Sequence, residues 1–565
     1  MVYNSSNPLI VQSDRTLLLE AINPLFEQAR DEIALFSELE KSPEYVHTYR
    51  ITPLSLWNAA ASGLTAEAII ASLRRYTKFE IPEGLIRYIV DYTERYGRVL
   101  IEPFDSSHII LKAQDELIAA EIWNDRNVRQ YISDRQDEVS FLVPLGERGR
   151  IKQALVKIGY PAKDLAGYVS GAPLDFRLKE FDSLGVPFRL RDYQRQAVDA
   201  FYAEGSAEGG SGVVVLPCGA GKTMVALGVM EKLRCHTLVL TTGVTAARQW
   251  IKELLDKTNL SPDLIGEYNG EKKLLRPVTI ATYNILVHRK RKTDDYPHFS
   301  LFNGSDWGLI VYDEVHLLPA PVFRITAEIQ ARRRLGLTAT LVREDGREEE
   351  VFTLIGPKKY DVPWKVLERQ RWIARAECLE IRVELVQDMR LAYAVSDERE
   401  KFRIASENPN KLPVIMELLR RHASDHVLII GQYINQLRDI ARMISAPIIT
   451  GDTPNHERER LYAQFRNGSL SRLVVSKVAN FSVDLPDANV AIQVSGTFGS
   501  RQEEAQRLGR VLRPKPGDNV AYFYSLVTKD SREQFFAANR QLFLTEQGYR
   551  YRIVNSDAVP VLGRG

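Results

Sequence analysis

From about residue 185 onward, short apolar runs alternate with segments of helical periodicity, and this alternation limits the possible folds more than any other feature of the chain. Continuous apolar runs are typical of strands buried on both faces, and strands separated by helices form parallel sheets. The sequence therefore predicts an α/β fold with two tandem parallel-sheet lobes, joined near residues 364–375. The expected strands are 213–216, 237–241, 278–281, 309–312 and 335–337 in the first lobe, and 427–430, 447–450, 472–476, 490–494 and 520–524 in the second.

The N-terminal part of the chain is predicted to hold α+β accessory domains. Apolar residues recur at helical spacing over residues 16–40, and three short helices are expected between residues 51 and 97. A hairpin of strands 99–103 and 108–112 should follow them. This order is that of a winged helix, but also of a small packing or docking domain. The expected domains are a helical region over 1–97, an α+β module over 98–175, lobes over 176–370 and 371–556, and a disordered tail over 557–565.

The composition excludes several classes of protein. Lys and Arg total 75 against 73 Asp and Glu, so any nucleic acid partner must meet basic residues gathered on particular surfaces. The three cysteines, Cys218, Cys235 and Cys378, form no CxxC pair, which argues against a disulfide scaffold and a zinc ribbon. They are also fewer than the roughly four cysteine ligands that an iron–sulfur cluster needs, which excludes such a cluster. No apolar stretch reaches 18 residues, so we expect no membrane segment and a cytoplasmic protein.

Residues 213–223 combine an apolar strand, a glycine loop and the start of a helix. Glycines permit close approach of the backbone, and loop N–H groups at a helix N-terminus face phosphate oxygens. Lys222 would reach the β- and γ-phosphates of ATP, and Thr223 would offer its hydroxyl to Mg²⁺. Leu216 stands where the full phosphate-loop pattern has its first glycine, and the structural alternative is a plain turn. The predicted nucleotide-binding residues are Gln194, Pro217, Cys218, Gly219, Ala220, Gly221, Lys222 and Thr223.

Two adjacent acids end the strand expected at 309–312. The carboxyl ends of strands are where ligands bind in α/β folds. Asp313 would hold Mg²⁺ together with Thr223, and Glu314 would orient and deprotonate the attacking water. His316, two residues further on, is expected to link the state of the nucleotide to nucleic acid. A lone segment of this kind would more often be a surface loop.

The second lobe carries an unusual polar face at residues 506–513. On a helix, Gln506, Arg510 and Arg513 share one side. An amide and two guanidiniums suit donors aimed at a γ-phosphate, whereas the alternative is a solvated basic helix. We therefore count these three residues, with Lys222 and Glu314, as the candidate catalytic set.

Polar turns follow several of the expected strands. Hydroxyls and small residues at strand ends are plausible contacts to a phosphate backbone or to catalytic carboxylates, although each turn alone is ordinary α/β loop chemistry. Thr338 and Thr340 are expected to couple the nucleotide site to nucleic acid. The candidate DNA contacts are Thr242, Arg248, Thr282 and Lys477.

Taken in order, the segments 193–194, 219–223, 313–316, 338–340 and 506–513 resemble the motif series of superfamily 2 helicases, which have two RecA-like lobes. Within that group the chain resembles the XPB/Ssl2/Rad25 DNA helicases in their shorter prokaryotic form. The narrower match depends on Pro217-Cys218, on Arg343-Glu344-Asp345 directly after Thr340, and on the segment 476–488. The resemblance is strong over about 185–530 and weaker over 1–180.

The resemblance implies an ATP-dependent 3′→5′ DNA helicase or double-strand translocase that acts in DNA repair or DNA opening. It implies a domain similar to the family's damage-recognition domain within 98–175, and it links Arg343, Glu344 and Asp345 to duplex opening. The expected partners are double-stranded or forked DNA and a nuclease or repair protein, with the chain itself a monomer.

The sequence departs from the family pattern in two places. Ala479-Asn480 stand where the family often has glycine and an acid, and the thumb-like insertion expected near 386–408 is short. Other readings stay open: an RNA helicase or restriction-type translocase, or a DNA-binding scaffold for a nuclease with weak ATPase activity. The basic segments 289–292 and 332–334 are further DNA-contact candidates, with a solvated loop as the alternative for the first.

Overall fold

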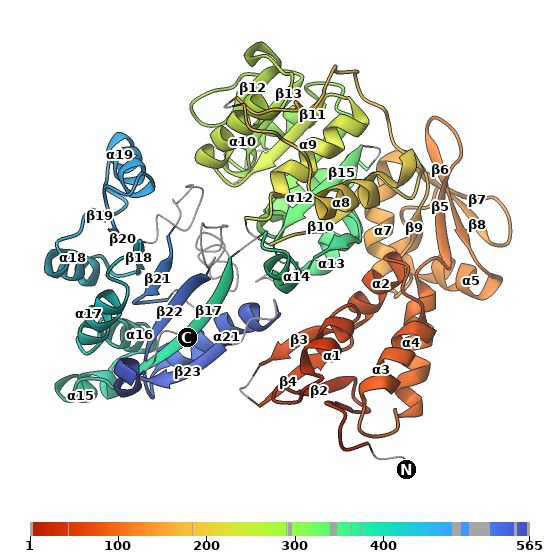
Figure 1. Cartoon of the computed structure of the whole chain (residues 1–565). Helices are drawn as coiled ribbons and strands as arrows, with labels where there is room; N and C mark the ends of the chain where they lie inside the picture. Colours follow the sequence, from red (N-terminus) through yellow and green to blue (C-terminus); the bar gives the residue numbers. More distant parts are fainter. Residues whose placement is uncertain are drawn as a thin grey trace. The chain divides into compact units, whose positions relative to one another are not determined.

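The structure, a computed structural model, forms two compact units, one built mainly from residues 1–362 and the other mainly from residues 363–565 (Figure 1). Among the described helices, none is long and apolar enough to cross a membrane. The described residues are 4–42, 45–183, 185–217, 219–289, 291, 296–330, 332–339, 347–362, 364–372, 374–476, 488–496, 520–546 and 551–561.

The first lobe is a seven-stranded parallel sheet with the strand order β12-β13-β11-β14-β15-β10-β16. All five strands expected in this lobe are confirmed, and β12 and β16 are added at the two edges. The strands are β10 (Ser211–Val215), β11 (Thr237–Thr241), β12 (Ile265–Tyr268), β13 (Val278–Thr282), β14 (Leu309–Asp313), β15 (Arg333–Thr338) and β16 (Lys358–Asp361).

Helices follow the strands of this lobe, as expected for parallel connections. Every residue of β11 and β13 is buried, so the centre of the sheet is covered on both faces. The helices are α8 (Asp192–Tyr202), α9 (Lys222–Leu233), α10 (Val244–Lys257), α11 (Tyr283–Leu286), α12 (Ala320–Glu328) and α13 (Glu348–Glu350), and a π-helical turn, η6 (Val351–Ile355), precedes β16.

The second unit repeats this plan in a parallel sheet with the order β19-β20-β18-β21-β22-β17-β23. Its five expected strands are confirmed, and β17 and β23 are added. The elements are α14 (Trp364–Arg369), β17 (Arg375–Val383), α15 (Gln387–Val395), α16 (Glu398–Ser406), α17 (Lys411–Arg421), β18 (Val427–Ile430), α18 (Ile434–Met443), β19 (Ile448–Ile449), α19 (Asn455–Arg466), β20 (Arg472–Val475), β21 (Val490–Gln493), β22 (Val520–Thr528), α21 (Arg532–Glu546) and β23 (Tyr551–Asn555).

The expected disordered tail is wrong for residues 557–561. A short 3-10 helix, η8 (Ser556–Val561), follows β23, which pairs with β17. The helix also lies against α17. The backbone is ordered there because it continues directly from a paired strand, and such tethering is what fixes a chain terminus. Residues 562–565 lie outside the described residues.

The N-terminal region is only partly helical. A four-stranded sheet of order β1-β2-β4-β3 occupies much of residues 9–50, so the helix expected over 16–40 is wrong except at α1. Leu17 and Leu19 are fully buried on one face of β2, and a short apolar run fits this period of two as well as a helical one. The three expected helices are confirmed. The elements are β1 (Leu9–Val11), β2 (Thr16–Glu20), α1 (Phe26–Ile33), β3 (Glu38–Lys41), β4 (Val46–Arg50), α2 (Pro53–Ala61), α3 (Ala66–Tyr76) and α4 (Glu83–Arg95).

The hairpin β5–β6 belongs to a separate sheet of order β7-β8-β6-β5-β9, so it pairs with strands of the second module and not as a wing beside the three helices. Helix α7 of this module packs tightly on α12 of the first lobe. The two helices are so close that a Cβ added at Gly149 would lie 2.3 Å from the Ala327 carbonyl oxygen. The elements are β5 (Val99–Pro103), β6 (His108–Ala113), α5 (Glu116–Asn124), α6 (Arg126–Arg129), β7 (Asp134–Arg135), β8 (Ser140–Pro144), α7 (Arg148–Lys157) and β9 (Lys163–Asp164).

Candidate active site

Three neighbouring strands of the first lobe place Lys222, Asp313 and Glu314 at the carboxyl end of the sheet. β15 lies between β10 and β14, and all three strands are parallel. Their carboxyl ends therefore meet, and they lead into the glycine loop after β10, into Thr338 at the end of β15 and into Asp313 at the end of β14. Ligands bind at this edge of α/β sheets.

The glycine loop has the backbone that its sequence predicts. Gly219 and Gly221 have φ angles of 82° and 80°, in the left-handed region that glycine adopts at little cost. Helix α9 begins directly afterwards, at Lys222. A Cβ added at Gly221 would lie 2.6 Å from Nε2 of Gln194, so the buried glutamine lies against the loop. Its Oε1 accepts a 2.9 Å hydrogen bond from the Arg191 backbone N–H, which fixes the amide.

Lys222 and Glu314 form an ion pair at the centre of this edge. The distance between Lys222 Nζ and Glu314 Oε1 is 2.6 Å, and the two side chains are 12% and 18% exposed. Glu314 has a φ of 51°, a strained backbone for a residue with a side chain. Such strain is typical of functional sites, because the surrounding structure must hold it. Here the left-handed turn ends β14 and is followed at once by the 3-10 turn η5 (Val315–Leu317).

Asp313 is held from two sides. The Trp250 indole N–H donates to its Oδ2 at 2.9 Å, and the Tyr283 hydroxyl donates to its backbone carbonyl oxygen at 2.8 Å. Burial first, and then the neighbouring Glu314 carboxylate, raise the pKa of Asp313. Burial also opposes ionisation of Glu314, but the adjacent Lys222 ammonium outweighs it and lowers the pKa of that carboxyl. A bound divalent cation would favour the charged form of Asp313.

A second contact links the acidic residues to β15. His316 Nδ1 lies 2.6 Å from the Thr338 hydroxyl oxygen and 3.5 Å from Glu314 Oε2, and both His316 and Thr338 are buried. The structure therefore brings together Glu314, His316 and Thr338.

The DNA-contact candidates have different environments. Thr282 is 3% exposed and its hydroxyl caps α11, so its side chain faces inward. Arg248 is half exposed and lies near two carboxylates, with its guanidinium 3.1 Å from Glu271 and 3.6 Å from Glu267. Thr242 is partly exposed after β11.

Several predicted site residues lie outside the described residues, and the structure does not place them. They are Cys218, Thr340, Arg343, Glu344, Asp345, Lys477, Gln506, Arg510 and Arg513.

Sequence reasoning did not assign roles to Trp250 and Tyr283, the two residues that hold Asp313. Both follow strand ends in segments with a polar turn, and Trp250 is the last residue of the segment 241–250. A tryptophan about two turns into a helix and a tyrosine at the start of another look like core residues in sequence. Their polar tips are visible only in three dimensions, because buried indole N–H and phenol groups usually find a partner.

The geometry suits the hydrolysis of a nucleoside triphosphate. The loop and the α9 N-terminus form a cradle for phosphates, Lys222 supplies a cation, and two carboxylates lie beside it on β14. The close contact between Gly221 and Gln194 leaves no room for a side chain at position 221.

Comparison with known proteins agrees with this chemistry. Family models described as "ERCC3/RAD25/XPB C-terminal helicase", "Helicase conserved C-terminal domain" and "Type III restriction enzyme, res subunit" match residues 367–560, 9–137 and 187–343. The chain is 52% identical to the "DNA 3'-5' helicase XPB" of Kineococcus radiotolerans over 98% of each chain. It is 51% identical to the protein of the same name from Mycobacterium tuberculosis, again over 98% of each chain.

A more distant relative covers nearly the whole chain as well. The "General transcription and DNA repair factor IIH helicase/translocase subunit XPB/SSL2" of Saccharomyces cerevisiae is 30% identical over 98% of this chain and 72% of its own length. Because the match extends through both lobes and the N-terminal modules, the chain belongs to the XPB/Rad25 family of superfamily 2 helicases and is an ATP-dependent DNA helicase.

Proposed function

We propose that this helicase hydrolyses ATP with Mg²⁺ at the edge formed by β10, β15 and β14, and that the reaction drives 3′→5′ movement along, or opening of, double-stranded or forked DNA. The Lys222–Glu314 ion pair beside Asp313 is the observation that carries the proposal. The direction and the DNA repair role rest on the printed names of the relatives.

Lys222 has two possible anionic partners, Glu314 and the phosphates of ATP. The exchange of one for the other determines when Glu314 can act on water. Without nucleotide its ammonium is held by Glu314 at 2.6 Å. The phosphates of ATP compete for the same ammonium, and their binding frees the Glu314 carboxylate to accept a proton from the attacking water. The water oxygen bonds to the γ-phosphorus as the bond to the ADP oxygen breaks. Thr223 and Asp313 would hold Mg²⁺, which supplies charge neutralisation for the phosphates, and Gln194 would bind the adenine edge.

The other proposed roles rest on the sequence. Gln506, Arg510 and Arg513 would donate hydrogen bonds to the γ-phosphate, where such a guanidinium can raise the rate by ~10³–10⁵. Arg343, Glu344 and Asp345 would act in duplex opening, and Thr242, Arg248 and Lys477 would contact the DNA backbone. Thr282 would contact DNA only through its own main-chain atoms, since its side chain is buried.

Partners follow from the relatives. Several eukaryotic members are named as subunits of a transcription and DNA repair factor, and this supports a repair assembly or nuclease as the partner of a monomeric chain. The second candidate function is a DNA-binding scaffold for a nuclease, with weak ATPase activity.

An unwinding and translocation assay on forked, bubble and blunt duplexes, with the wild type beside Lys222→Ala, tests the proposal. The wild type should consume ATP faster when DNA is present and should open or track at least one of these substrates. Lys222→Ala should lose both activities but keep DNA binding. If wild-type turnover were negligible and unchanged by Lys222→Ala, the scaffold would be the correct function.

A further inference from the structure

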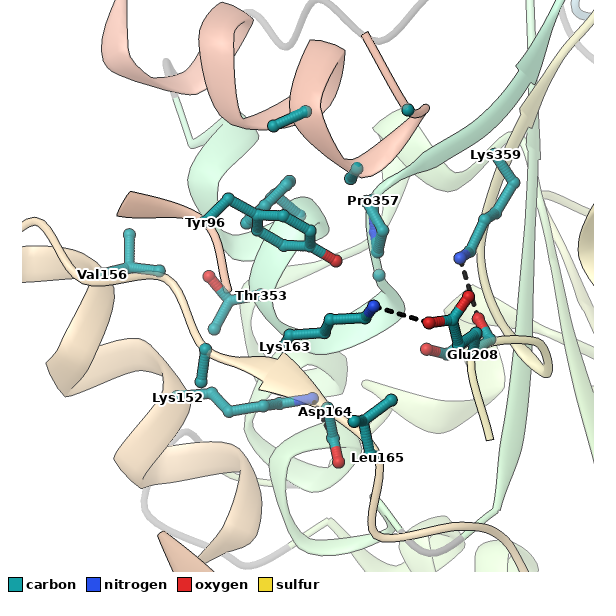
Figure 2. Close-up of a pocket in the computed structure, with 17 residues that line it drawn as sticks. Tyr96, Lys152, Val156, Lys163, Asp164, Leu165, Glu208, Thr353, Pro357 and Lys359 are labelled. Carbon is teal, nitrogen blue, oxygen red and sulfur yellow. Dashed lines mark hydrogen bonds and ion pairs between the residues drawn. The ribbon is translucent and has the colours of Figure 1, made fainter. Parts of the chain in front are cut away.

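A cavity lies where the three parts of the first unit meet, beside Ser211 at the start of β10, whereas the candidate active site lies at the carboxyl ends of β10, β15 and β14. Its volume is about 220 Å³, and it is lined by the end of α2, by β9 and α7 of the second module, and by β10, η6 and β16 of the first lobe (Figure 2). At about 30 Å³ for each water, it holds roughly seven waters, or a small ion with part of its hydration shell.

Basic side chains outnumber acidic ones around this cavity. Lys152 and, behind it, Arg148 share one carboxylate, that of Asp164, at 3.0 and 2.8 Å. Lys163 takes the other carboxylate of the lining, that of Glu208, at 2.5 Å. The carboxylates of Asp164 and Glu208 thus pair with three cations, and Lys359 adds a fourth positive charge.

Lys359 has no carboxylate of its own within the described part of the chain. Its ammonium donates to the Glu208 backbone carbonyl oxygen at 2.8 Å, while the Glu208 carboxylate is paired with Lys163. Burial lowers the pKa of Lys359, the Glu208 carboxylate opposes this shift, and the nearby Lys163 adds to it. Burial, with Arg334 and Arg148 nearby, also lowers the pKa of Lys152 to about 7, although Asp164 opposes the shift. Both ammonium groups are therefore costly to keep charged without a further anion.

A hydroxyl donor faces the same space. The Tyr96 ring extends into the cavity, and Figure 2 shows its hydroxyl on the same side as the Lys163 and Lys359 ammonium groups. Burial raises the pKa of Tyr96 well above its usual range, so this phenol remains a proton donor. The described residues provide no hydrogen-bond partner for it.

We propose that this cavity binds a phosphate-sized oxyanion, with Lys359 and Tyr96 as its principal donors and Lys163 beside them. The anion would compensate the surplus positive charge at the place where the N-terminal region, the second module and the first lobe meet. Oxyanions suit this set, because ammonium and phenol donors form short charge-assisted hydrogen bonds to them. The site is separate from the phosphate cradle at Lys222, and the proposal does not depend on the function proposed above.

Calorimetric titration of the full chain with inorganic phosphate tests the proposal. A saturating non-hydrolysable ATP analogue is present throughout, so that the phosphate cradle is already filled. Ionic strength is held constant with chloride. We expect one saturable phosphate site in the wild type. Glycerol 3-phosphate in a parallel titration distinguishes a site for free phosphate from one that also accepts a phosphate monoester.

Matched variants assign the site. Lys359→Met should weaken phosphate binding about tenfold or more, and Tyr96→Phe should weaken it severalfold, because each removes one donor. Lys252→Met removes a surface lysine on α10 and should leave binding unchanged. Tyr96→Phe keeps the ring in place, so it remains informative if Lys359→Met does not fold. No saturable binding in the wild type, or equal affinity in Lys359→Met, Tyr96→Phe and Lys252→Met, would overturn the proposal.

Discussion

At the scale of single residues, Glu314 is held ionised until nucleotide arrives. Its carboxylate pairs with Lys222, which lowers its pKa, and it can accept a proton once the phosphates of ATP take up the ammonium. The first prediction follows from this arrangement. Glu314→Gln should bind ATP but hydrolyse it ~10²–10⁴-fold more slowly, as expected for the loss of a general base.

Nucleotide binding and single-turnover hydrolysis, measured side by side, check the Glu314 prediction. Glu116→Gln, which alters an exposed glutamate on α5, is the matched control and should behave as the wild type does. Normal turnover by Glu314→Gln would show that another group activates the water.

The expected role of Trp250 depends on a single atom, its indole nitrogen. Its indole N–H fixes the Asp313 carboxylate, the proposed Mg²⁺ ligand. Trp250→Phe retains most of the ring but removes the donor, and groups that orient a metal ligand typically contribute 10–100-fold to affinity or activity. We expect the Mg²⁺ concentration for half-maximal ATPase activity to rise by about this factor. Trp123→Phe, in the second module, is the control. An unchanged Mg²⁺ requirement would mean that Asp313 is positioned without the indole.

At the scale of helices and strands, the strands that were predicted correctly are those with continuous apolar runs. The central strands β11, β13, β14, β18 and β21 are buried throughout or nearly so, and their sequences show it. The strand β16, with the sequence Lys-Lys-Tyr-Asp, lies at a sheet edge where no apolar run is needed. Strand β17, which lies beside the edge strand β23, was not predicted because charged residues interrupt its apolar positions, including the fully buried Glu380. That Lys222 and Glu314 belong to one site was predictable from motif order, whereas their ion pair and the support from Trp250 and Tyr283 required the fold.

Helix α7 gives the third prediction, since it brings a buried lysine to the first lobe. Lys152 donates to Gln330 at 2.6 Å and to Asp164 at 3.0 Å, with Arg148 and Arg334 as like charges nearby. Its pKa of about 7 in the folded chain lies below the ordinary value of 10.5. Between these values the unfolded chain binds more protons than the folded chain, so this lysine makes folding more favourable as pH rises from about 7 to 10.5. Its cost to stability is fully present below pH 7.

Calorimetric unfolding at pH 7 and pH 9, in buffer without phosphate, tests the effect of Lys152. The wild type should gain stability over this interval, by an amount approaching ~1.4 kcal/mol for each pH unit from this residue. Lys152→Met cannot titrate and should gain less, and the difference between the two proteins isolates the contribution of the lysine. Lys252→Met should behave as the wild type does. Equal gains in Lys152→Met and the wild type would place the pKa of Lys152 near its ordinary value.

At the scale of the whole molecule, the central question is how ATP hydrolysis is converted into DNA opening. The contacts described at the nucleotide site, Lys222 with Glu314 and His316 with Thr338 at the end of β15, lie within the first lobe. The segment that follows β15 carries Arg343, Glu344 and Asp345, which the family resemblance links to duplex opening. A residue that acts on DNA should be separable from the chemistry of ATP, because hydrolysis needs only the groups around the phosphates.

The last prediction applies this separation. Arg343→Ala should keep most of the DNA-stimulated ATPase activity, within about twofold of the wild type, yet open a forked duplex at least about tenfold more slowly, since a guanidinium that meets DNA phosphates or bases is lost. Stopped-flow unwinding and ATPase rates measured on the same fork give the ratio of base pairs opened to ATP consumed. Arg371→Ala, which changes an exposed arginine shortly after α14, is the control and should leave this ratio unchanged. A fall in ATPase activity equal to the fall in unwinding would assign Arg343 to the nucleotide site, and coupling would then have to run through other residues, with His316 and Thr338 as candidates.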